Sequence, residues 1–424
     1  MIGRATALLE AIFGDAFRRD FGVRLWDGTN LPSSTERTDF TLLVNTPGAL
    51  RSAFTPPLER NAGATFITGG LDVEGDITRA IAALNTANDS RTALQKARIG
   101  LLLLRLPRDP RPAPPGAELH GKLHSPQRDR AAISYHYDHP VDFYRTFLDR
   151  DLVYSCAYFD DGVTTIDGAQ QAKLAYVLDK LRLEPGLSFL DIGCGWGSLV
   201  IAAARRGAQA LGITLSRVQY EEANRRIAAL GLGDRARVEF RDYRDLAGLT
   251  FDRIASIGMV EHVGRKLLPV YFTAAIAALR PGGLFLNHGI AEQSPGRKAP
   301  ANPFIERYVF PDGDLVAAAD SLAIAERTGF EIRDVENLRE HYARTLRAWV
   351  ANLERNRDAA IAAAGEAAYR VWRLYMAASA VSFDNASIGV YQSLLARPSV
   401  DGRVTIPPTR RDLYSAQRTQ SAAS

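Results

Sequence analysis

The pattern of apolar and polar positions divides the chain into parts of different character. Near the N-terminus, apolar residues recur at the spacing of one helix face, at Leu8, Leu9, Ile12, Phe13 and Phe17, and residues 40–44 (FTLLV) form a strand pattern. The pattern is again helical from Asp76 to about Leu104, and five prolines between 107 and 115 then exclude a helix. These patterns predict a small α+β domain over residues 1–105, followed by a Pro-rich basic linker over 106–130.

After residue 185, short apolar strands alternate with helices, which is typical of a doubly wound parallel sheet. Strands are predicted at 187–192, 208–213, 236–240, 253–257 and 283–288. A long helical region at about 338–378 and a last strand at 388–394 complete the pattern. The fold class is therefore α/β, with a Rossmann-like doubly wound domain over 131–400 and a tail over 401–424. We expect the end of the tail, residues 418–424, to be disordered.

The composition indicates in which cellular compartment the protein is expected. The 424 residues are 46% hydrophobic and 24% charged, as in an ordinary soluble protein. Only two cysteines occur, Cys156 and Cys194, so a disulfide framework is excluded and a reducing compartment is expected. Glu10 and Asp15 interrupt the first apolar stretch, and no run approaches the roughly 20 apolar residues of a membrane-spanning helix. We therefore expect a cytoplasmic protein, or one associated peripherally with the inner face of the membrane.

The net charge of +4 is too small a bias to indicate a nucleic-acid partner, but its distribution is uneven. Residues 1–90 hold 8 Lys and Arg against 11 Asp and Glu, whereas residues 91–130 hold 9 against 3. The basic segment has two interpretations, which the sequence leaves open. It is either a solvated linker or a contact with anionic lipid head groups, which attract basic residues by about 1 kcal/mol each near the surface.

The first predicted strand of the sheet turns into a helix through residues 190–197 (LDIGCGWG). Glycines at 193, 195 and 197 would let the backbone approach a ligand closely at the carboxyl edge of the sheet. This G-x-G-x-G spacing, with Asp191 two residues before the first glycine, resembles the first motif of class I S-adenosylmethionine (SAM) methyltransferases. The second strand lacks the acidic residue that usually ends it in such enzymes. Thr214 and Gln219 are neutral hydrogen-bonding groups that could replace it.

Five further segments accompany this loop in order: 154–159 (YSCAYF), 258–264 (GMVEHVG), 285–290 (FLNHGI), 304–311 (FIERYVFP) and 341–349 (HYARTLRAW). The ordered set resembles the cyclopropane-fatty-acyl-phospholipid synthase family, including the mycolic acid cyclopropane synthases, over about 130–397. Residues 69–76 (GGLDVEGD) are also similar to the G-x-(I/L)-D-V-E-G-D segment of that family's extra N-terminal domain. In the family this domain accompanies action on acyl chains of intact phospholipids.

The resemblance implies the reaction and its ligands. SAM would deliver a methylene to the cis double bond of an unsaturated phospholipid chain, by methyl transfer, carbocation formation and proton removal by a bound bicarbonate. The implied cofactor-binding residues are Tyr154, Ser155, Asp191, Gly193, Gly195, Gly197, Thr214, Leu215, Gln219, Asp242 and Tyr243. The implied bicarbonate ligands are Cys156, Glu261, His288, Ile290 and Tyr342.

Within the bicarbonate set, Glu261 would accept the bicarbonate proton and end the relay. His288 and Tyr342 would donate hydrogen bonds, and Cys156 and Ile290 would act mainly through backbone groups. Such a base is needed because a carboxylate placed directly against the carbocation could trap it as an ester. A metal is not expected, since these residues lack the closely spaced ligand pairs of structural sites.

Other functions are compared with this one. A fatty-acyl methyltransferase that leaves a methyl or methylene branch would use the same cofactor and lipid. A nucleic-acid methyltransferase is disfavoured because no basic face accompanies the motifs. A lipid-binding protein without catalytic activity would be expected to have lost part of the glycine loop or some of the bicarbonate ligands. The sequence leaves the oligomeric state open, with a homodimer as one option.

Overall fold

The computed structural model describes residues 1–14, 20–34, 38–89, 92–112, 114–293, 303–411 and 413. Phe17 and residues 418–424, on which two expectations fall, lie outside these ranges. The chain forms two compact units. One comprises Met1–Glu118, Pro300–Pro311 and Leu353–Ser382, and the other comprises Leu119–Ala299, Asp312–Asn352 and Phe383–Ser424. The first unit thus includes two segments from the range assigned to the catalytic domain, and the domain boundaries stay a prediction.

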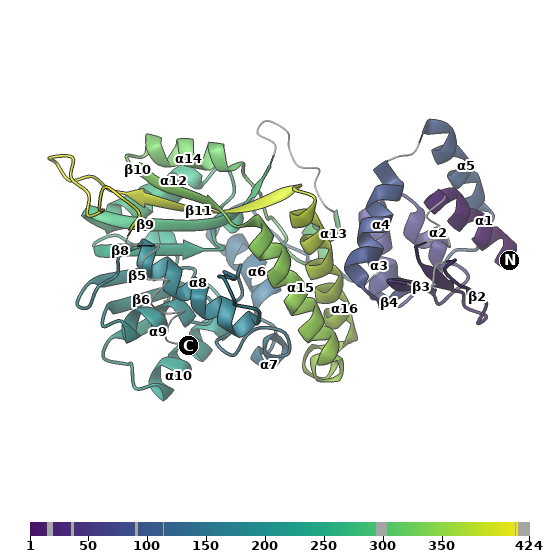
Figure 1. Ribbon diagram of the computed structural model, residues 1–424, viewed down its shortest axis with the longest axis horizontal. Helices are drawn as coiled ribbons and strands as arrows, with labels where there is room; N and C mark the ends of the chain where they lie inside the picture. The colour runs from purple at the N-terminus through teal and green to yellow at the C-terminus, as the bar shows by residue number, and fades with distance from the viewer. Residues whose placement is uncertain are drawn as a thin grey trace. The chain divides into compact units, whose positions relative to one another are not determined.

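The first unit combines helices with a four-stranded sheet in the order β2-β1-β3-β4, as expected for a small α+β region (Figure 1). β3 pairs in parallel with β1 and antiparallel with β4, while β1 pairs antiparallel with β2. Its elements are α1 (Ile2–Phe13), β1 (Gly22–Arg24), β2 (Asn30–Leu31), β3 (Phe40–Val44), α2 (Ala49–Phe54), α3 (Leu58–Ile67), β4 (Leu71–Gly75), α4 (Ile77–Asp89), α5 (Ala93–Leu104), α13 (Pro303–Tyr308) and most of α16 (Arg357–Asp384).

The helical pattern from Asp76 to Leu104 forms two helices instead of one continuous helix. α5 has its own N-cap at Thr92, whose side chain accepts from the N–H of Gln95 at 3.3 Å. The Gln95 side chain in turn accepts from the N–H of Thr92 at 2.8 Å. This capping box satisfies two N–H groups that a helix start leaves without partners, so a second helix begins here.

One acidic side chain holds β4 against α16 within this unit. Asp72, from the GGLDVEGD segment, accepts from Arg370 at 2.8 Å and from Arg373 at 3.0 Å. Arg373 also donates to Glu354 at 2.7 Å. Both arginines are largely buried. Asp72 is therefore a structural link between two segments about 300 residues apart in the sequence.

The start of the predicted linker is packed against the first unit. Leu106 is buried, and Asp109 accepts from Thr46 at 2.7 Å. Arg111 donates to Asp109 and to the backbone carbonyl of Thr68, both at 2.7 Å. The later residues 126–130 already form the first turns of a helix, α6 (Pro126–Tyr137). Much of the basic segment therefore has defined structure.

The second unit contains a seven-stranded sheet in the order β10-β11-β9-β8-β5-β6-β7. β11 runs antiparallel to its neighbours, and the five central and edge strands from β9 to β7 are parallel. The strands are β5 (Ser188–Ile192), β6 (Gln209–Thr214), β7 (Ala236–Phe240), β8 (Phe251–Ile257), β9 (Leu279–Glu292), β10 (Glu331–Asn337) and β11 (Ile388–Ala396). The remaining helices are α6, α7 (Val141–Arg145), α8 (Ile166–Lys180), α9 (Ser198–Arg205), α10 (Arg217–Ala229), η2 (Tyr243–Asp245), α11 (Val260–Val263), α12 (Leu268–Ala278), α14 (Ala318–Arg327) and α15 (Arg339–Arg355).

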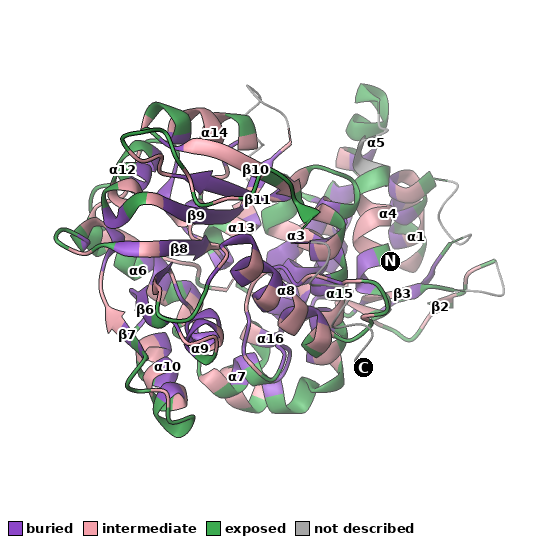
Figure 2. Cartoon of the chain, turned by 60° about the vertical axis from the view of Figure 1, so that its left-hand side comes forward, coloured by how far each residue is buried: buried purple, intermediate pink, exposed green. Residues whose placement is uncertain are grey.

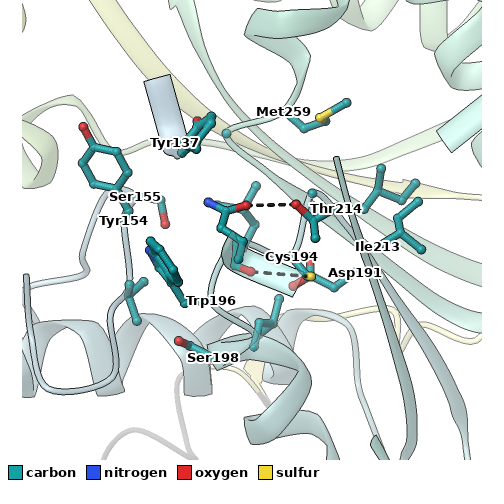
Figure 3. A pocket seen from close by; sticks show the side chains of 18 of the residues that line it. Tyr137, Tyr154, Ser155, Asp191, Cys194, Trp196, Ser198, Ile213, Thr214 and Met259 are labelled. Atoms are coloured by element: carbon teal, nitrogen blue, oxygen red, sulfur yellow. Dashed lines mark hydrogen bonds between the residues drawn. The ribbon is translucent and has the colours of Figure 1, made fainter. Parts of the chain in front are cut away.

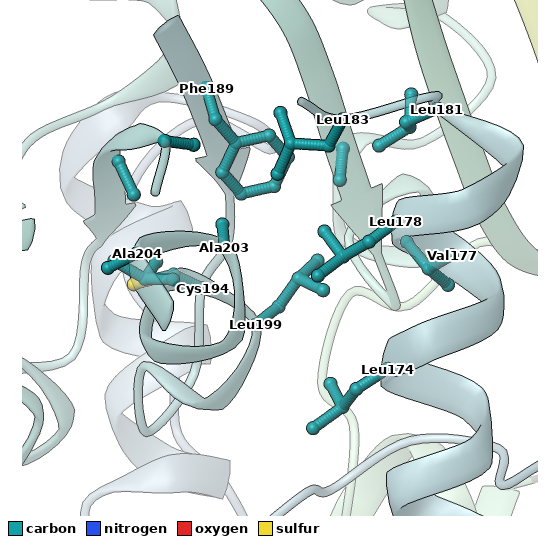
Figure 4. Close-up of a cluster of buried hydrophobic side chains, with 14 of the residues drawn as sticks. Leu174, Val177, Leu178, Leu181, Leu183, Phe189, Cys194, Leu199, Ala203 and Ala204 are labelled. Carbon is teal, nitrogen blue, oxygen red and sulfur yellow. The ribbon is translucent and has the colours of Figure 1, made fainter. Parts of the chain in front are cut away.

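Helices cover both faces of this sheet, and alternate strand residues enter two separate cores. Phe189 packs with Leu178 of α8 and Leu199 of α9 on one face (Figure 4). The neighbouring Leu190 packs on the other face among residues of α11 and α12. The central strands are accordingly buried, as Figure 2 shows.

The prediction of a Rossmann-like doubly wound sheet is confirmed. All six predicted strands coincide with observed strands, although β9 is longer at both ends than predicted. β10 was missed because its sequence, EIRDVEN, holds only two apolar residues, three positions apart, and so shows neither an apolar run nor strict alternation; most of its residues remain partly exposed at the sheet edge. Among the described residues, every helix is too short or too polar to span a bilayer.

Candidate active site

A pocket lies at the carboxyl ends of the parallel strands, where the order of the sheet reverses. β5 pairs with β6 on one side and with β8 on the other, and ligands bind doubly wound sheets at such switch points. The pocket is lined by the loop after β5, by Thr214 at the end of β6 and by Met259 after β8 (Figure 3). The sequence-predicted glycine loop is therefore at the expected edge of the sheet.

The three glycines of this loop have different surroundings. All three have positive φ: 77° at Gly193, 53° at Gly195 and 80° at Gly197, which glycine adopts without steric cost. A Cβ at Gly197 would lie 3.0 Å from the Cβ of Ala223, so this glycine allows α9 and α10 to pack. A Cβ at Gly195 would meet no atom within 4 Å. Gly195 therefore faces the open pocket.

Two buried ionisable side chains, Asp191 and Lys173, line the pocket. Burial raises the pKa of the Asp191 carboxyl to about 7, while the nearby Lys173 ammonium opposes the shift. Burial lowers the pKa of Lys173 to about 8, against the effect of nearby acidic groups. The ammonium donates to Oγ of Ser155 at 3.0 Å. A ligand with both an amino group and a carboxylate would therefore find groups of either sign here.

Thr214 and Gln219, the neutral residues expected in place of the usual acidic residue, are hydrogen-bonded to each other. Oγ1 of Thr214 donates to Oε1 of Gln219 at 2.9 Å, and both residues line the pocket (Figure 3). Oγ of Ser216, which caps α10, accepts from the backbone N–H of Gln219 at 3.2 Å. The amide nitrogen of Gln219 can then donate to a ligand hydroxyl.

Most of the predicted cofactor-binding residues line this pocket: Tyr154, Ser155, Asp191, Gly193, Gly195, Thr214, Leu215, Gln219 and Tyr243. Gly197 and Asp242 lie outside the lining. Asp242 instead accepts from Arg244 at 2.8 Å through the Nε of that arginine. It also accepts from the backbone N–H of Arg244 at 2.9 Å, which caps η2.

Glu261, the predicted acceptor of the bicarbonate proton, is hydrogen-bonded to another of the predicted bicarbonate ligands. The backbone N–H of Ile290 donates to Oε1 of Glu261 at 2.7 Å. Burial raises the pKa of Glu261 to about 7, and this hydrogen bond opposes the shift. The second oxygen, Oε2, is buried and has no hydrogen-bond partner within the described chain. Glu261 thus presents an acceptor with a pKa suited to proton transfer near neutral pH.

His288 offers a complementary group two residues before Ile290 on β9. Burial, with smaller effects of Lys173 and Lys180, lowers the pKa of His288 to about 3, so the ring is neutral at physiological pH. Its Nε2 is buried and, among the residues that the structure describes, has no hydrogen-bond partner. An orphaned nitrogen and an orphaned carboxylate oxygen are the kinds of group that a small oxyanion such as bicarbonate would satisfy. The residues present fit that ion.

Cys156 and Tyr342 both contact the backbone carbonyl of Leu338. The carbonyl of Leu338 lies 3.8 Å from Sγ of Cys156 and accepts from the N–H of Tyr342 at 3.1 Å. The N–H of Leu338 donates to Val390, the strand partner of Ile290. Burial raises the pKa of the Cys156 thiol well above its ordinary value, so it is unsuited to be a nucleophile. The five predicted residues thus belong to one connected region.

This region adjoins the glycine-loop pocket along the chain. Ser155 and Met259 line the pocket, while the neighbouring Cys156 and Glu261 belong to the base set. Glu261 and Ile290 also line a second, smaller pocket beside β9 and β11. The arrangement can hold a cofactor in the first pocket. No cluster of three or more potential metal-binding side chains occurs in the described ranges.

Comparison with known proteins agrees with this geometry. The profile of the mycolic acid cyclopropane synthetase family matches residues 124–393. A protein of Pseudomonas putida named as a probable fatty acid methyltransferase is 39% identical over 397 residues, which cover 92% of this chain and 95% of that protein. The chain belongs to the mycolic acid cyclopropane synthetase family.

Two further relatives place the chain within this family. The cyclopropane-fatty-acyl-phospholipid synthase of Escherichia coli K12 is 34% identical over 288 residues, covering 68% of this chain and 73% of that enzyme. The crystal structure of mycolic acid cyclopropane synthase CmaA1 complexed with SAH and CTAB matches with a TM-score of 0.58 and 33% identity, over 63% of this chain and 97% of CmaA1. The family and this SAH complex support the use of SAM.

Sequence reasoning missed several residues that line the pocket. The pocket is also lined by Tyr137, Lys173, Trp196, Met259 and His262. Tyr137 Oη lies 3.1 Å from Nε2 of His262, and burial lowers the pKa of His262 to about 4. Lys173 could have been noticed as a basic residue on the apolar side of α8, between Ala169 and Val177.

Proposed function

We propose that this protein is a cyclopropane-fatty-acyl-phospholipid synthase. The observation that carries the proposal is the pairing of Glu261 with Ile290 beside His288, next to a glycine-loop pocket suited to SAM. Ring closure requires a base that removes a proton from the new methyl group, whereas a saturated methyl branch does not. The name of the Escherichia coli relative supplies the substrate class, unsaturated acyl chains of phospholipids.

SAM supplies an electrophilic methyl group on a sulfonium, and bicarbonate supplies a base. The alkene electron pair forms a bond to that methyl carbon as the carbon–sulfur bond breaks, which leaves SAH and a carbocation on the chain. Loss of a proton from the new methyl group then lets its electrons close the three-membered ring. Glu261 would take the proton passed on by the base, and His288 would hold the base by a hydrogen bond.

The rings packed beside Tyr342, and two further members of the bicarbonate set, are neutral. Tyr342 contacts Phe383 with ring centroids 4.7 Å apart and Trp349 at 6.2 Å. Aromatic faces attract a cation without supplying a nucleophile that would trap it. His288 and the buried thiol of Cys156 are neutral as well, so the base set adds no positive charge beside the sulfonium or the carbocation.

A second candidate is a fatty-acyl methyltransferase that leaves a methyl or methylene branch. The Pseudomonas putida relative, named a probable fatty acid methyltransferase and matched over almost its whole length, favours it. Both candidates begin with the same methyl transfer. A methylene branch forms when a hydride shifts from the methylated carbon to the cationic carbon before the new methyl group loses a proton, and a saturated methyl branch needs a hydride from a separate donor.

Expression in a bacterial host that lacks such an enzyme, followed by lipid mass spectrometry, tests both candidates. A ring adds CH₂ and removes the double bond, so the product resists ozonolysis. A methylene branch adds the same mass but keeps a double bond that ozone cleaves, and a saturated methyl branch adds two further hydrogens. An ozone-sensitive or more saturated product would contradict the synthase proposal, and unmodified lipid would contradict both candidates.

We also propose that the protein reaches its substrate by docking α5 on a membrane surface with anionic head groups. Leu94, Leu101 and Leu104 are 85%, 64% and 67% exposed, and their spacing places them on one side of the helix. Arg98 and Arg105 lie beside this apolar side and are exposed. Exposed leucines flanked by basic residues are typical of helices that lie in the plane of an anionic interface.

A further inference from the structure

His288 has a buried partner on the neighbouring strand. His288 of β9 and Gln392 of β11 are directly opposite each other in the antiparallel pair, so their side chains share one face of the sheet. Nδ1 of His288 lies 3.2 Å from Nε2 of Gln392. Both residues are buried, with 2% and 0% of their surface exposed. This contact leaves only Nε2 of His288 for another partner.

The orientation of the Gln392 amide is fixed from its other side. Nζ of Lys180, at the end of α8, lies 2.9 Å from Oε1 of Gln392. An ammonium has three donors and no acceptor, so it must face the oxygen of the amide. A reversed amide would place its NH₂ group against the ammonium. The NH₂ group of Gln392 therefore points to His288.

Lys180 is itself held in place. Its side chain is only 1% exposed, and it forms an ion pair with Glu336 and a longer one, at 3.6 Å, with Asp334. Both carboxylates lie on β10, and Glu336 also accepts from Tyr176 at 2.9 Å. A buried ammonium is retained only with such partners, because leaving it unpaired costs several kcal/mol. The acidic residues thus neutralise the charge and keep Lys180 against Gln392.

This arrangement dictates the tautomer of His288. An amide NH₂ group can only donate, so Nδ1 of His288 must accept and carry no proton. The ring is neutral, since burial lowers its pKa to about 3. A neutral ring whose Nδ1 is bare carries its proton on Nε2. This nitrogen is the one that has no partner in the described chain.

We propose that Lys180 and Gln392 are positioning residues that hold His288 as an Nε2–H donor for the oxyanion base. The tautomer follows from the contacts alone, while the identity of the acceptor rests on the proposed function. A neutral donor holds the oxyanion without adding a positive charge, which would disfavour a carbocation nearby. The lysine acts through the amide, so its charge stays paired with Glu336 and away from the reacting atoms.

Nitrogen NMR of protein labelled with ¹⁵N-histidine, without SAM or lipid, tests the tautomer directly. The spectrum distinguishes protonated from bare ring nitrogens, and His288→Asn assigns the signal among the seven histidines. In the wild type we expect a bare Nδ1 and a protonated Nε2, with no titration of this ring between pH 5 and 8. A protonated Nδ1 in the wild type would overturn the proposal.

The variant Gln392→Glu is expected to reverse the tautomer of His288. The two side chains have nearly the same shape, and one carboxylate oxygen can still accept from Lys180. The other oxygen can only accept, so Nδ1 of His288 must acquire a proton, and the pKa of the ring must rise beside the new negative charge. Glu331→Gln is the control, because it removes one negative charge from the same strand, β10, but Glu331 pairs with Arg333 instead of Lys180. A bare Nδ1 in Gln392→Glu, or a changed tautomer in Glu331→Gln, would contradict the positioning of His288 by Lys180 and Gln392.

Measuring the binding of ¹³C-bicarbonate distinguishes a failure of the positioning role from a failure of the proposed function. Gln392→Met keeps the volume of the side chain but cannot donate to Nδ1, so His288 loses its fixed tautomer. Loss of a comparable outer partner of a metal-bound histidine weakens binding by about 10- to 100-fold, and we expect a similar loss of bicarbonate affinity. Unchanged affinity in Gln392→Met would contradict the positioning role. If the wild type shows the expected tautomer but does not bind bicarbonate, bicarbonate is not the base. The positioning of His288 by Gln392 and Lys180 would still hold.

Discussion

The backbone N–H of Ile290 donates to one carboxylate oxygen of Glu261 at 2.7 Å, and the other oxygen of Glu261 is buried without a partner in the described chain. The first contact fixes the direction of the carboxyl group, and the second leaves an acceptor available. The carboxyl is thereby prepared to receive a proton instead of serving only as a structural link between α11 and β9.

Glu261→Gln is expected to retain the fold and SAM binding but to lose about 10²- to 10⁴-fold in turnover, as is typical when a general base is removed. The amide is nearly isosteric, and its oxygen can still accept from Ile290. Turnover is measured by cyclopropane formation on phospholipid vesicles, with SAM affinity from calorimetry as the control. Ring formation at the wild-type rate would show that the proton leaves by another route.

The same carboxyl is expected to titrate near pH 7, since burial raises its pKa from 4.5 to about that value. Below this pH it is protonated and cannot accept, so its catalytic contribution rises with pH. The folded state binds this proton more tightly than the unfolded chain, so the wild type should lose stability relative to Glu261→Gln as pH rises from about 4.5 to 7. Infrared difference spectra of the carboxyl stretch, wild type minus variant, measure the titration. A group fully ionised at pH 5 would contradict it.

Gly195→Val should abolish SAM binding while the protein remains folded. The new side chain would enter the open pocket, since no atom of the chain lies within 4 Å of a Cβ there. The positive φ should cost about 1–2 kcal/mol of folding free energy. Gly162→Val is the matched control, because Gly162 also has a positive φ of 78° and open surroundings but does not line the pocket. Equal SAM affinities in the two variants would exclude Gly195 from the cofactor site.

Asp72→Asn should destabilise the first unit by about 1–3 kcal/mol, because it removes the carboxylate that two largely buried arginines share and leaves each with a single carboxylate, Glu366 for Arg370 and Glu354 for Arg373. Glu74→Gln is the control on the same strand. The ion pair of Glu74 with Arg24 is about half exposed at both side chains, so its loss should cost less than about 1 kcal/mol. Urea unfolding followed by limited proteolysis compares the two variants. Similar free energies of unfolding would show that the Asp72 cluster adds nothing to stability.

Replacement of Leu101 and Leu104 by Gln, or of Arg98 and Arg105 by Gln, should weaken association with anionic vesicles. At about 1 kcal/mol for each basic residue, the double arginine variant should lose roughly tenfold or more in affinity. Its remaining binding should depend less on salt, since salt screens exposed charges over about 10 Å at 0.1 M. Arg111 is unsuitable for this test because it is tied to Asp109 and Thr68.

Arg205→Gln with Arg235→Gln, two exposed basic residues of the other unit, controls for a loss of net charge. Vesicle flotation measures the association. If the α5 variants bind like the wild type, α5 does not dock on the membrane. If the leucine variant instead abolishes a dimer seen by ultracentrifugation, a second copy of the chain covers this helix and the docking proposal is wrong.

The sequence by itself determined the local features of this protein. Strand periodicity and the glycine spacing at 193, 195 and 197 depend on near neighbours, so the parallel sheet and its loop could be predicted before any contact was known. The resemblance of the ordered motifs supplied Glu261, His288 and the rest of the base set. It could not show whether these side chains meet, because segments such as those of Cys156 and Leu338 are separated by 182 positions.

Only the tertiary structure decided how the groups act on one another. The proton position on His288 depends on Gln392 and Lys180, which come from β11 and α8 and lie 212 positions apart. The register of two antiparallel strands and the end of a helix must all be set before a donor-only ammonium can orient the amide. Likewise, α16 joins the first unit because Arg370 and Arg373 reach Asp72. A periodic pattern records which side of an element is buried, and hydrogen bonds between distant elements decide what the buried polar groups do.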